Sequence, residues 1–311
     1  MLSILVGFSD ELMPASTTRH NRCIASRPHE LRRLARVEVG GDLLIIALAV
    51  VTSTIGAIGG LGGAIILVPL LTFGGMSITS AAPLGLVSVI AGSVAAGRRQ
   101  ASDGTVNHRF AVVTELGATS GAVVGVLLSG VLSERVLLWC LAMFAVAAAL
   151  LGARRKGMRW QPDTNLTVAD VGERRGSLSG AYLLDQSVVP YTPSRMPLGV
   201  CLMALAGVVT GLAGVGGGFL KTPLSSEVMR LPAKVAAGTS TFTIGLTASV
   251  ALVLMAIDGR IVAADAALVV LGSLVGGTIG ARVQTMLSPP VVRRTTAVAL
   301  VAIAIVLVIR A

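Results

Sequence analysis

The segment GVGGGFLKTP, residues 214–223, gathers four glycines, a lysine, a threonine and a proline within an otherwise apolar stretch. Glycine and proline both disfavour a continuous helix, and a charge at membrane depth is costly. A helix that stops there leaves free backbone N–H groups, and the N-terminus of the helix that follows attracts anions. Lys221 adds a positive charge and Thr222 adds a hydroxyl donor. This combination predicts a binding site for a small anion.

A second segment, GLGGAIILVP at residues 60–69, repeats the glycine and proline spacing at an offset of 154 residues, as from Pro69 to Pro223. Leu67 stands where Lys221 stands in the other copy, so the charge belongs to one copy only. The candidate substrate-binding residues of the two motifs are Gly60, Gly62, Gly63, Pro69, Gly214, Gly216, Gly217, Gly218, Lys221, Thr222 and Pro223.

Neither motif fits a nucleotide-binding loop. A P-loop requires GxxxxGK[ST], but Leu220 precedes Lys221, and a dinucleotide fingerprint requires glycine where Phe219 stands. The three cysteines are far apart and the three histidines lie outside the apolar segments, so the sequence predicts neither a metal nor any other cofactor. No cluster of titratable residues converges in the sequence, and we do not predict an enzyme.

The composition is that of a membrane protein. Hydrophobic residues make up 54% of the 311 residues and charged residues only 13%, whereas soluble domains carry about 25% charged residues. The sequence therefore predicts an all-α integral membrane protein with about eight transmembrane helices. The apolar segments lie near 42–72, 78–96, 110–132, 136–153, 197–225, 237–257, 264–287 and 291–309.

The first segment of each group of four is too long for one straight span. About 30 residues of helix extend roughly 45 Å, against about 30 Å of hydrocarbon. The glycine motif lies near the middle of each, so we expect both helices to be broken there. Backbone groups freed inside a membrane must face protein or a watery cavity, which places both breaks near the midplane, opposite each other.

The two groups also match beyond the glycine motifs. Asp103-Gly104 and Asp258-Gly259 are related by an offset of 155 residues, and so are two glycine stripes at four-residue spacing. We predict two repeats of four helices, with domains at 1–38 (a basic cytoplasmic tail), 39–155 (first repeat), 156–195 (a polar linker loop) and 196–311 (second repeat). The glycine stripes are Gly117, Gly121 and Gly125 in the first repeat and Gly272, Gly276 and Gly280 in the second.

Basic residues lie mostly between the apolar segments and give the chain a net charge of +10. By the positive-inside rule, they place the N-terminus, the loop at 97–109 and the central linker in the cytoplasm. Each repeat crosses an even number of times if every segment spans once, so the halves are expected to run in the same direction. An inverted arrangement stays open, because that topology puts four basic residues outside: Arg230, Lys234, Arg293 and Arg294.

Other polar residues fall inside the apolar segments. Gly238, Thr239 and Ser240 form a second candidate binding group, since short hydroxyls can line an anion path, although they also bond helices together. Glu115 is a candidate for proton coupling. The structural alternatives are that Lys221 reaches the interface or pairs with Glu227, and that Glu115 pairs with a neighbour such as Arg109.

The two glycine motifs, read with KVAAGTSTFTI at residues 234–244, resemble the TauE/SafE sulfite-exporter-like permeases. The resemblance covers about residues 40–311, apart from the linker. It implies that the chain moves small sulfur-containing anions, such as sulfite or organosulfonates, across a bacterial inner membrane. It places the motif residues above and Gly238, Thr239 and Ser240 in the family's motifs. Pro83-Leu84-Gly85 replaces the second Gly-Thr-Ser set, so the substrate stays open.

We therefore predict a multi-pass secondary transporter whose partners are a small anion and the lipid bilayer. Aromatic residues make up only 3% of the chain, which argues against nucleic acid as a partner. The sequence leaves open whether the protein forms a homo-oligomer. The alternative is a membrane scaffold or a subunit of a membrane complex that transports nothing, with the glycine faces serving its partners.

Overall fold

A computed structural model describes residues 28–133, 163–184 except 164, and 187–287, with single positions or short runs between 135 and 150 and between 291 and 301. By internal contacts the chain forms two units, residues 1–43 and residues 44–311. In the first unit, residues 28–43 are helical and form the first half of α1 (Pro28–Gly59). The predicted tail at 1–38 therefore ends in helix, and its residues 1–27 lie outside the described residues.

Six helices among the described residues are long and apolar enough to cross a membrane. Aliphatic side chains such as Leu116, Leu127 and Leu246 are exposed on these helices, as lipid contact requires. A multi-pass membrane protein is confirmed, whereas the predicted spans at 136–153 and 291–309 fall largely outside the described residues. The six are the part of α1 at Gly41–Gly59, α3 (Ile78–Ser102), α4 (His108–Ser129), α6 (Met196–Ala213), α8 (Ala233–Ile257) and α9 (Ala263–Met286).

Both glycine motifs interrupt a helix, as predicted. The short helix α2 (Ala64–Phe73) starts four residues after Gly60, and α7 (Gly218–Pro223) follows Gly214 in the same way. A π-helical turn, η3 (Leu224–Val228), continues α7. Gly60 and Gly214 adopt left-handed backbone angles, with φ of 66° and 68°. Residues with a Cβ avoid this region at a cost of about 1–2 kcal/mol, which explains the glycines.

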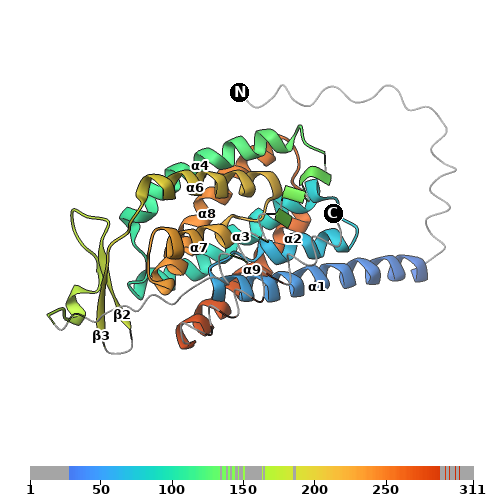
Figure 1. Cartoon of the computed structure of the whole chain (residues 1–311). Coiled ribbons are helices and arrows are strands. Elements are labelled where there is room, and N and C mark those ends of the chain that lie inside the picture. The colour runs from blue at the N-terminus through green and yellow to red at the C-terminus, as the bar shows by residue number, and fades with distance from the viewer. Residues whose placement is uncertain are drawn as a thin grey trace, which may run out of the picture. The chain divides into compact units, whose positions relative to one another are not determined.

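At each interruption the chain folds back on itself. A Cβ placed on Gly63 would lie 2.7 Å from the Cα of Ser53, and one on Gly217 would lie 2.9 Å from the carbonyl of Ala206. Residues that far apart along one continuous helix would be separated by about 15 Å. Each break is therefore a helical hairpin rather than a kink in a span (Figure 1).

The two central helices run in opposite directions. Ser93 of α3 lies against Gly245 of α8, where an added Cβ would be 3.3 Å from the Cβ of Ser93. Gly97, four residues later on α3, lies against Phe242, three residues earlier on α8. Since α3 and α8 are the second apolar segments of their groups, the expectation that the halves run in the same direction is wrong for these helices. The hairpin at each glycine motif reverses the chain, which the count of apolar segments did not include.

The glycine stripes serve close packing between helices that run in the same direction. On α4, a Cβ at Gly117 would meet Val200 of α6, and one at Gly121 would lie 3.1 Å from the Cα of Ala204. The stripe on α9 packs along α1 in the same way, residue for residue. Its contacts are Gly272 with Ile46, Gly276 with Val50 and Gly280 with Thr54.

The contacts of α9 with α1 and α3 give helix directions that differ from the expected topology. Both α1 and α3 run parallel to α9, since Ser53 of α1 donates a hydrogen bond to the Ser273 carbonyl and Ser273 donates to Ser88 of α3. Further along, Gln100 of α3 donates to Gln284 of α9, which in turn donates to the Ile58 carbonyl of α1. Within residues 44–311, the first turn of α1 and the loop after α3 thus lie at opposite ends of the bundle. The expectation that both lie on one side does not fit these helix directions.

The segment predicted as a linker loop contains a small antiparallel sheet of β1 (Gly172–Glu173), β2 (Gly180–Leu184) and β3 (Ser187–Tyr191), preceded by a 3-10 turn, η2 (Val168–Asp170). An all-α membrane fold fits the structure, and the strands among the described residues lie in this segment between the two groups of helices. Pro190 had suggested a loop, but it lies in the edge strand β3, where proline is tolerated. Asn107 at the start of α4 donates to Tyr191, and burial raises the pKa of that phenol.

The opposite directions of α3 and α8 can be tested by labelling. Asp103 and Asp258 occupy matched Asp-Gly turns after α3 and α8, and their following glycines have φ of 66° and 70°. In a variant without the native cysteines, we expect Asp103→Cys and Asp258→Cys to react with a membrane-impermeant maleimide from opposite sides. One should label in intact cells and the other only after permeabilisation. Labelling of both from one side would contradict the fold.

Candidate functional site

The two interruptions meet at one backbone carbonyl. Thr222 of α7 donates its hydroxyl to the carbonyl of Gly60 at 2.9 Å, and Ser240 of α8 donates to the same oxygen at 3.4 Å. A Cβ placed on Gly218 would lie 2.7 Å from the carbonyl of Leu61. Candidate residues from both glycine motifs and from the hydroxyl-rich helix α8 are therefore brought together.

Two aliphatic side chains lie between the interruptions. A Cβ on Gly62 would be 3.0 Å from Ile244 and 3.1 Å from Val89, and one on Gly216 would be 2.6 Å from Val89 and 3.3 Å from Ile244. Both side chains are buried, as are the glycines around them, apart from the half-buried Gly62. The sequence analysis missed this pair. The feature of the sequence that could have identified this pair is the offset of 155 residues between Val89 and Ile244, which also relates the two copies elsewhere.

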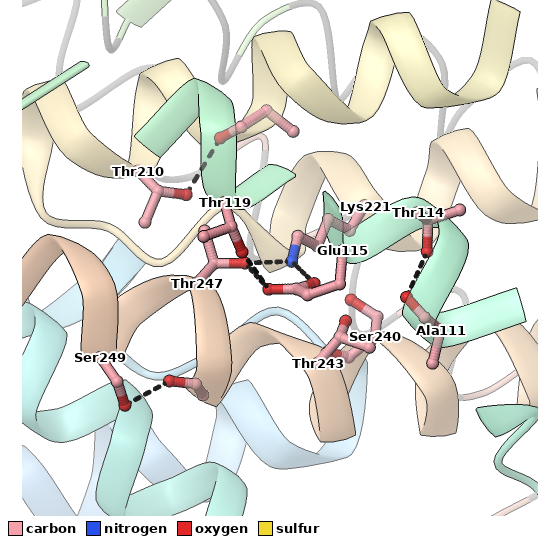
Figure 2. A network of polar contacts seen from close by, with 12 residues as sticks. Ala111, Thr114, Glu115, Thr119, Thr210, Lys221, Ser240, Thr243, Thr247 and Ser249 are labelled. Atoms are coloured by element: carbon pink, nitrogen blue, oxygen red, sulfur yellow. Dashed lines mark hydrogen bonds and ion pairs between the residues drawn. The ribbon is translucent and has the colours of Figure 1, made fainter. Parts of the chain in front are cut away.

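Lys221 and Glu115 form a buried ion pair. The Lys221 Nζ lies 2.7 Å from the Glu115 Oε2, with side-chain exposures of 3% and 10%. Lys221 also donates to the Thr247 hydroxyl, and Thr247 donates to the other carboxylate oxygen of Glu115. Figure 2 shows these three side chains converging from α7, α4 and α8. The two charges that the sequence offered separately, one for anion binding and one for proton coupling, pair with each other.

Burial of this pair depends on its hydrogen bonds. Removing two charges from water costs several kcal/mol per ion, and their attraction offsets this only when the remaining donors and acceptors are also satisfied. Thr247 supplies one contact to each charge, and Thr119 adds a weaker one to Glu115 at 3.4 Å. Sequence reasoning did not single out Thr247. Helical spacing could have identified it, since Ser240, Thr243 and Thr247 recur at intervals of three and four residues on one face of α8.

Other predicted residues take structural positions. The Thr239 hydroxyl accepts a hydrogen bond from the backbone N–H of Asn107 at 3.1 Å, at the start of α4. A Cβ on Gly238 would lie 3.0 Å from the carbonyl of Thr105, so this glycine permits close packing of α8 on the loop before α4. Pro69 and Pro223 are buried within α2 and at the end of α7. None of these four contributes a polar side chain to the contacts around Lys221.

A small cavity of about 10 Å³ lies beside the first interruption. Gly62 and Gly63 line it together with Ser53, Ser93 and Thr241. A space of this size holds about one water molecule. An anion with several heavy atoms does not fit there unless the surrounding helices move.

The polar contacts are concentrated in one of the two copies. At the offsets of 154 or 155 residues, every polar member of the site has an apolar or glycine counterpart. The pairs are Lys221 and Leu67, Thr222 and Val68, Ser240 and Gly85, Thr247 and Gly92, and Glu115 and Val270. The site is thus built once, although the backbone pattern that surrounds it occurs twice.

The family model described as "Sulfite exporter TauE/SafE" matches residues 45–307. The chain belongs to the TauE/SafE sulfite exporter family. It is 25% identical over 251 residues to the probable membrane transporter protein YunE of Bacillus subtilis (strain 168), which covers 78% of this chain and 88% of the relative. No solved structure matches the chain.

Membership in TauE/SafE identifies the chain as a membrane transporter rather than an enzyme. Among the described residues, no group of three or more His, Cys, Asp or Glu side chains is arranged to hold a metal ion. The prominent polar cluster among these residues is the Lys221 ion pair with Glu115 and Thr247.

Substitution of Gly214 tests how tightly the interruptions are packed. A Cβ on Gly214 would clash with the backbone of Ala82, whereas Gly259, which has a similar φ of 70°, has nothing within 4 Å. Gly259→Ala should therefore cost only the backbone strain of about 1–2 kcal/mol. Gly214→Ala should lower the melting temperature of the detergent-solubilised protein clearly further. Equal losses would contradict the close approach.

A double-mutant cycle tests the ion pair. Lys221→Met alone leaves a buried carboxylate without its partner, which should cost about 3–5 kcal/mol. The double variant Lys221→Met/Glu115→Gln removes both charges and should regain a large part of that loss. Melting temperatures of the two single variants and the double variant measure this coupling. Losses that simply add would contradict direct pairing.

Proposed function

We propose that the chain is a secondary transporter of a small anion, sulfite or an organosulfonate, which binds beside the two interruptions with Lys221 as its positive partner. The observation that carries the proposal is the buried Lys221, which lies three residues inside a helix that starts at a glycine break. A buried cation is suited to a substrate that brings the opposite charge and takes the place of its protein partner. Thr222 and Ser240 place hydroxyl groups at the same interruption, where both donate to the Gly60 carbonyl. Release of that bond on substrate binding would let them donate to sulfonate oxygens.

We further propose that the chain consists of two inverted repeats of four apolar segments. Support comes from the opposite directions of α3 and α8 and from contacts that recur at the same offset. Gly60 packs on Ala237, and Gly214 packs on Ala82, with each glycine meeting the other copy. Inverted repeats in secondary transporters place the substrate at the repeat interface near the bilayer midplane, and movement of one half against the other alternates access.

In this proposal the described structure is a closed state. Val89 and Ile244 fill the space between the glycines of the two motifs, and the adjoining cavity admits about one water molecule. Transport then requires α3 and α8 to separate on one side, since each carries one of the two side chains. The small residues at Gly62 and Gly216 allow the two halves to close completely again.

The charges of the loops favour one orientation in the bacterial inner membrane. The bundle end that carries the loop after α3 also carries Arg98, Arg99 and Arg109, and the chain enters α8 there beside Arg230 and Lys234. With α8 inverted relative to α3, these basic residues share one side, whereas a same-direction arrangement separates them. We propose that this side is cytoplasmic. The α1 span would then begin at the opposite side, against the expectation for the N-terminal tail.

Uptake into proteoliposomes tests the function. We expect saturable uptake of radiolabelled sulfite, competed by sulfoacetate or taurine but not by acetate. Loss of a charge-assisted bond of about 1.5–3 kcal/mol predicts that Lys221→Met lowers uptake by about tenfold or more. Lys234→Met, a lysine at the start of α8, is the matched control and should transport like the wild type.

Two results would overturn the proposal. The first is a folded wild-type protein whose sulfite uptake equals that of empty vesicles. The second is wild-type transport by Lys221→Met, which would place the anion elsewhere in the molecule.

A further inference from the structure

We infer that Glu115 carries the coupling proton, so that each monovalent anion crosses together with one proton in an electroneutral step. This inference rests on the proposed anion site, and it adds the coupling ion and the stoichiometry. The residues involved are Glu115 and Lys221, with Thr247 between them.

The geometry makes the anion and Glu115 competitors for one cation. The ammonium of Lys221 has three N–H donors, and two of them contact Glu115 and Thr247. The carboxylate of Glu115 occupies the position from which a second anion would neutralise Lys221. An anion that neutralises Lys221 in place of Glu115 therefore displaces the carboxylate from this contact.

Among the described residues of the helices packed around the pair, no other cation lies close enough to replace Lys221 as the partner of Glu115. Helix α6 has no charged residue between Met196 and Ala213, and α7 has only Lys221. On α8 the sole charged residue is Lys234, 13 positions before Thr247 and so about 20 Å away along the helix. On α4 itself, His108 and Arg109 lie at least six residues before Glu115, about 9 Å along the axis. Glu227 of η3 has the same charge sign as Glu115.

Charge balance then requires a proton. Without substrate, Lys221 and Glu115 sum to zero in a buried site. When a monovalent anion binds Lys221, a displaced Glu115 would leave a net negative charge in a place with little water, which is strongly unfavourable. If bulk water donates a proton to a carboxylate oxygen of Glu115, the site again sums to zero. Release of the anion reverses both steps, the proton returns to bulk water, and the ion pair forms again.

The residues that correspond to the ion pair in the other copy explain why the proposal needs only one proton for each anion. Val270 and Leu67 stand at the positions that correspond to Glu115 and Lys221, and Gly92 corresponds to Thr247. The related half of the molecule therefore has no matching carboxylate, lysine or hydroxyl. One ion pair binds one anion and one proton.

The experiment separates proton coupling from transport itself. Proteoliposomes loaded with unlabelled sulfite report exchange of radiolabelled sulfite, which needs no net proton movement. Vesicles with an acidic exterior and an alkaline interior report accumulation driven by the pH gradient, and an internal pH dye reports proton movement. Empty vesicles correct for sulfite that crosses unaided. Wild type, Glu115→Gln and Glu115→Asp are compared, and the membrane potential is varied with valinomycin and potassium.

The expected result is that the wild type accumulates sulfite with the pH gradient, without dependence on membrane potential. Glu115→Gln should still exchange sulfite above the level of empty vesicles, and it should lose accumulation and proton movement. Glu115→Asp, which retains a carboxylate, should keep both activities in part. Accumulation by Glu115→Gln that still follows the pH gradient would overturn the inference and leave anion transport intact. Absence of exchange by the wild type would overturn the proposed function and the inference together.

A measurement on the wild type covers the outcome in which Glu115→Gln does not fold. Dicyclohexylcarbodiimide reacts with protonated carboxyl groups in apolar surroundings, and mass spectrometry locates the modified residue. We expect sulfite to increase modification of Glu115, because binding frees and protonates this side chain. Modification that sulfite leaves unchanged or decreases would overturn the inference.

Discussion

A helix that stops inside an apolar segment leaves backbone groups that lipid cannot satisfy, and most of the contacts in this structure follow from how that constraint is met. The carbonyl of Gly60 faces hydroxyl donors from Thr222 and Ser240, which belong to the other half of the chain. The hairpin tips must therefore lie against each other. Their close approach requires glycine, because a Cβ at Gly60 or Gly214 would press into the backbone of Ala237 or Ala82. The glycine stripes on α4 and α9 then fix the helices that hold the tips together.

The same constraint explains why a lysine can stand next to one tip. A buried cation needs an anionic partner and a full set of acceptors, and α4 and α8 supply them as Glu115 and Thr247. The corresponding place in the other half is filled by Leu67, Val270 and Gly92, which need no such support. Near-symmetric backbone packing and asymmetric side-chain chemistry are thus compatible. One half can change its polar residues while the glycines keep the shared framework.

Sequence reasoning reached the elements that depend on local rules. The two interruptions follow from the position of Gly60 and Gly214 in segments too long to span once, and the candidate role of Lys221 follows from its cost in lipid. The pairing of Lys221 with Glu115 could not be predicted, because 106 residues separate them and the direction of each half was unknown. That direction depends on whether the chain kinks or reverses at the glycines, and both choices satisfy the same residue pattern. The sheet in the linker was missed because Pro190 indicates a loop unless its strand lies at an edge.

The reversal of the chain at each glycine motif also explains why basic residues from both halves lie at one end of the bundle. If every segment spanned once in the same sense in both halves, Arg230 and Lys234 would face the side opposite to Arg98 and Arg99. With α3 and α8 antiparallel, the end of α3 and the beginning of α8 lie at the same end of the bundle, so these four residues gather there. A feature of the glycine backbone, the left-handed φ that lets the chain turn back, therefore brings these basic residues to one end of the bundle. The contact between the hairpin tips and this basic end thus depend on the same few glycines.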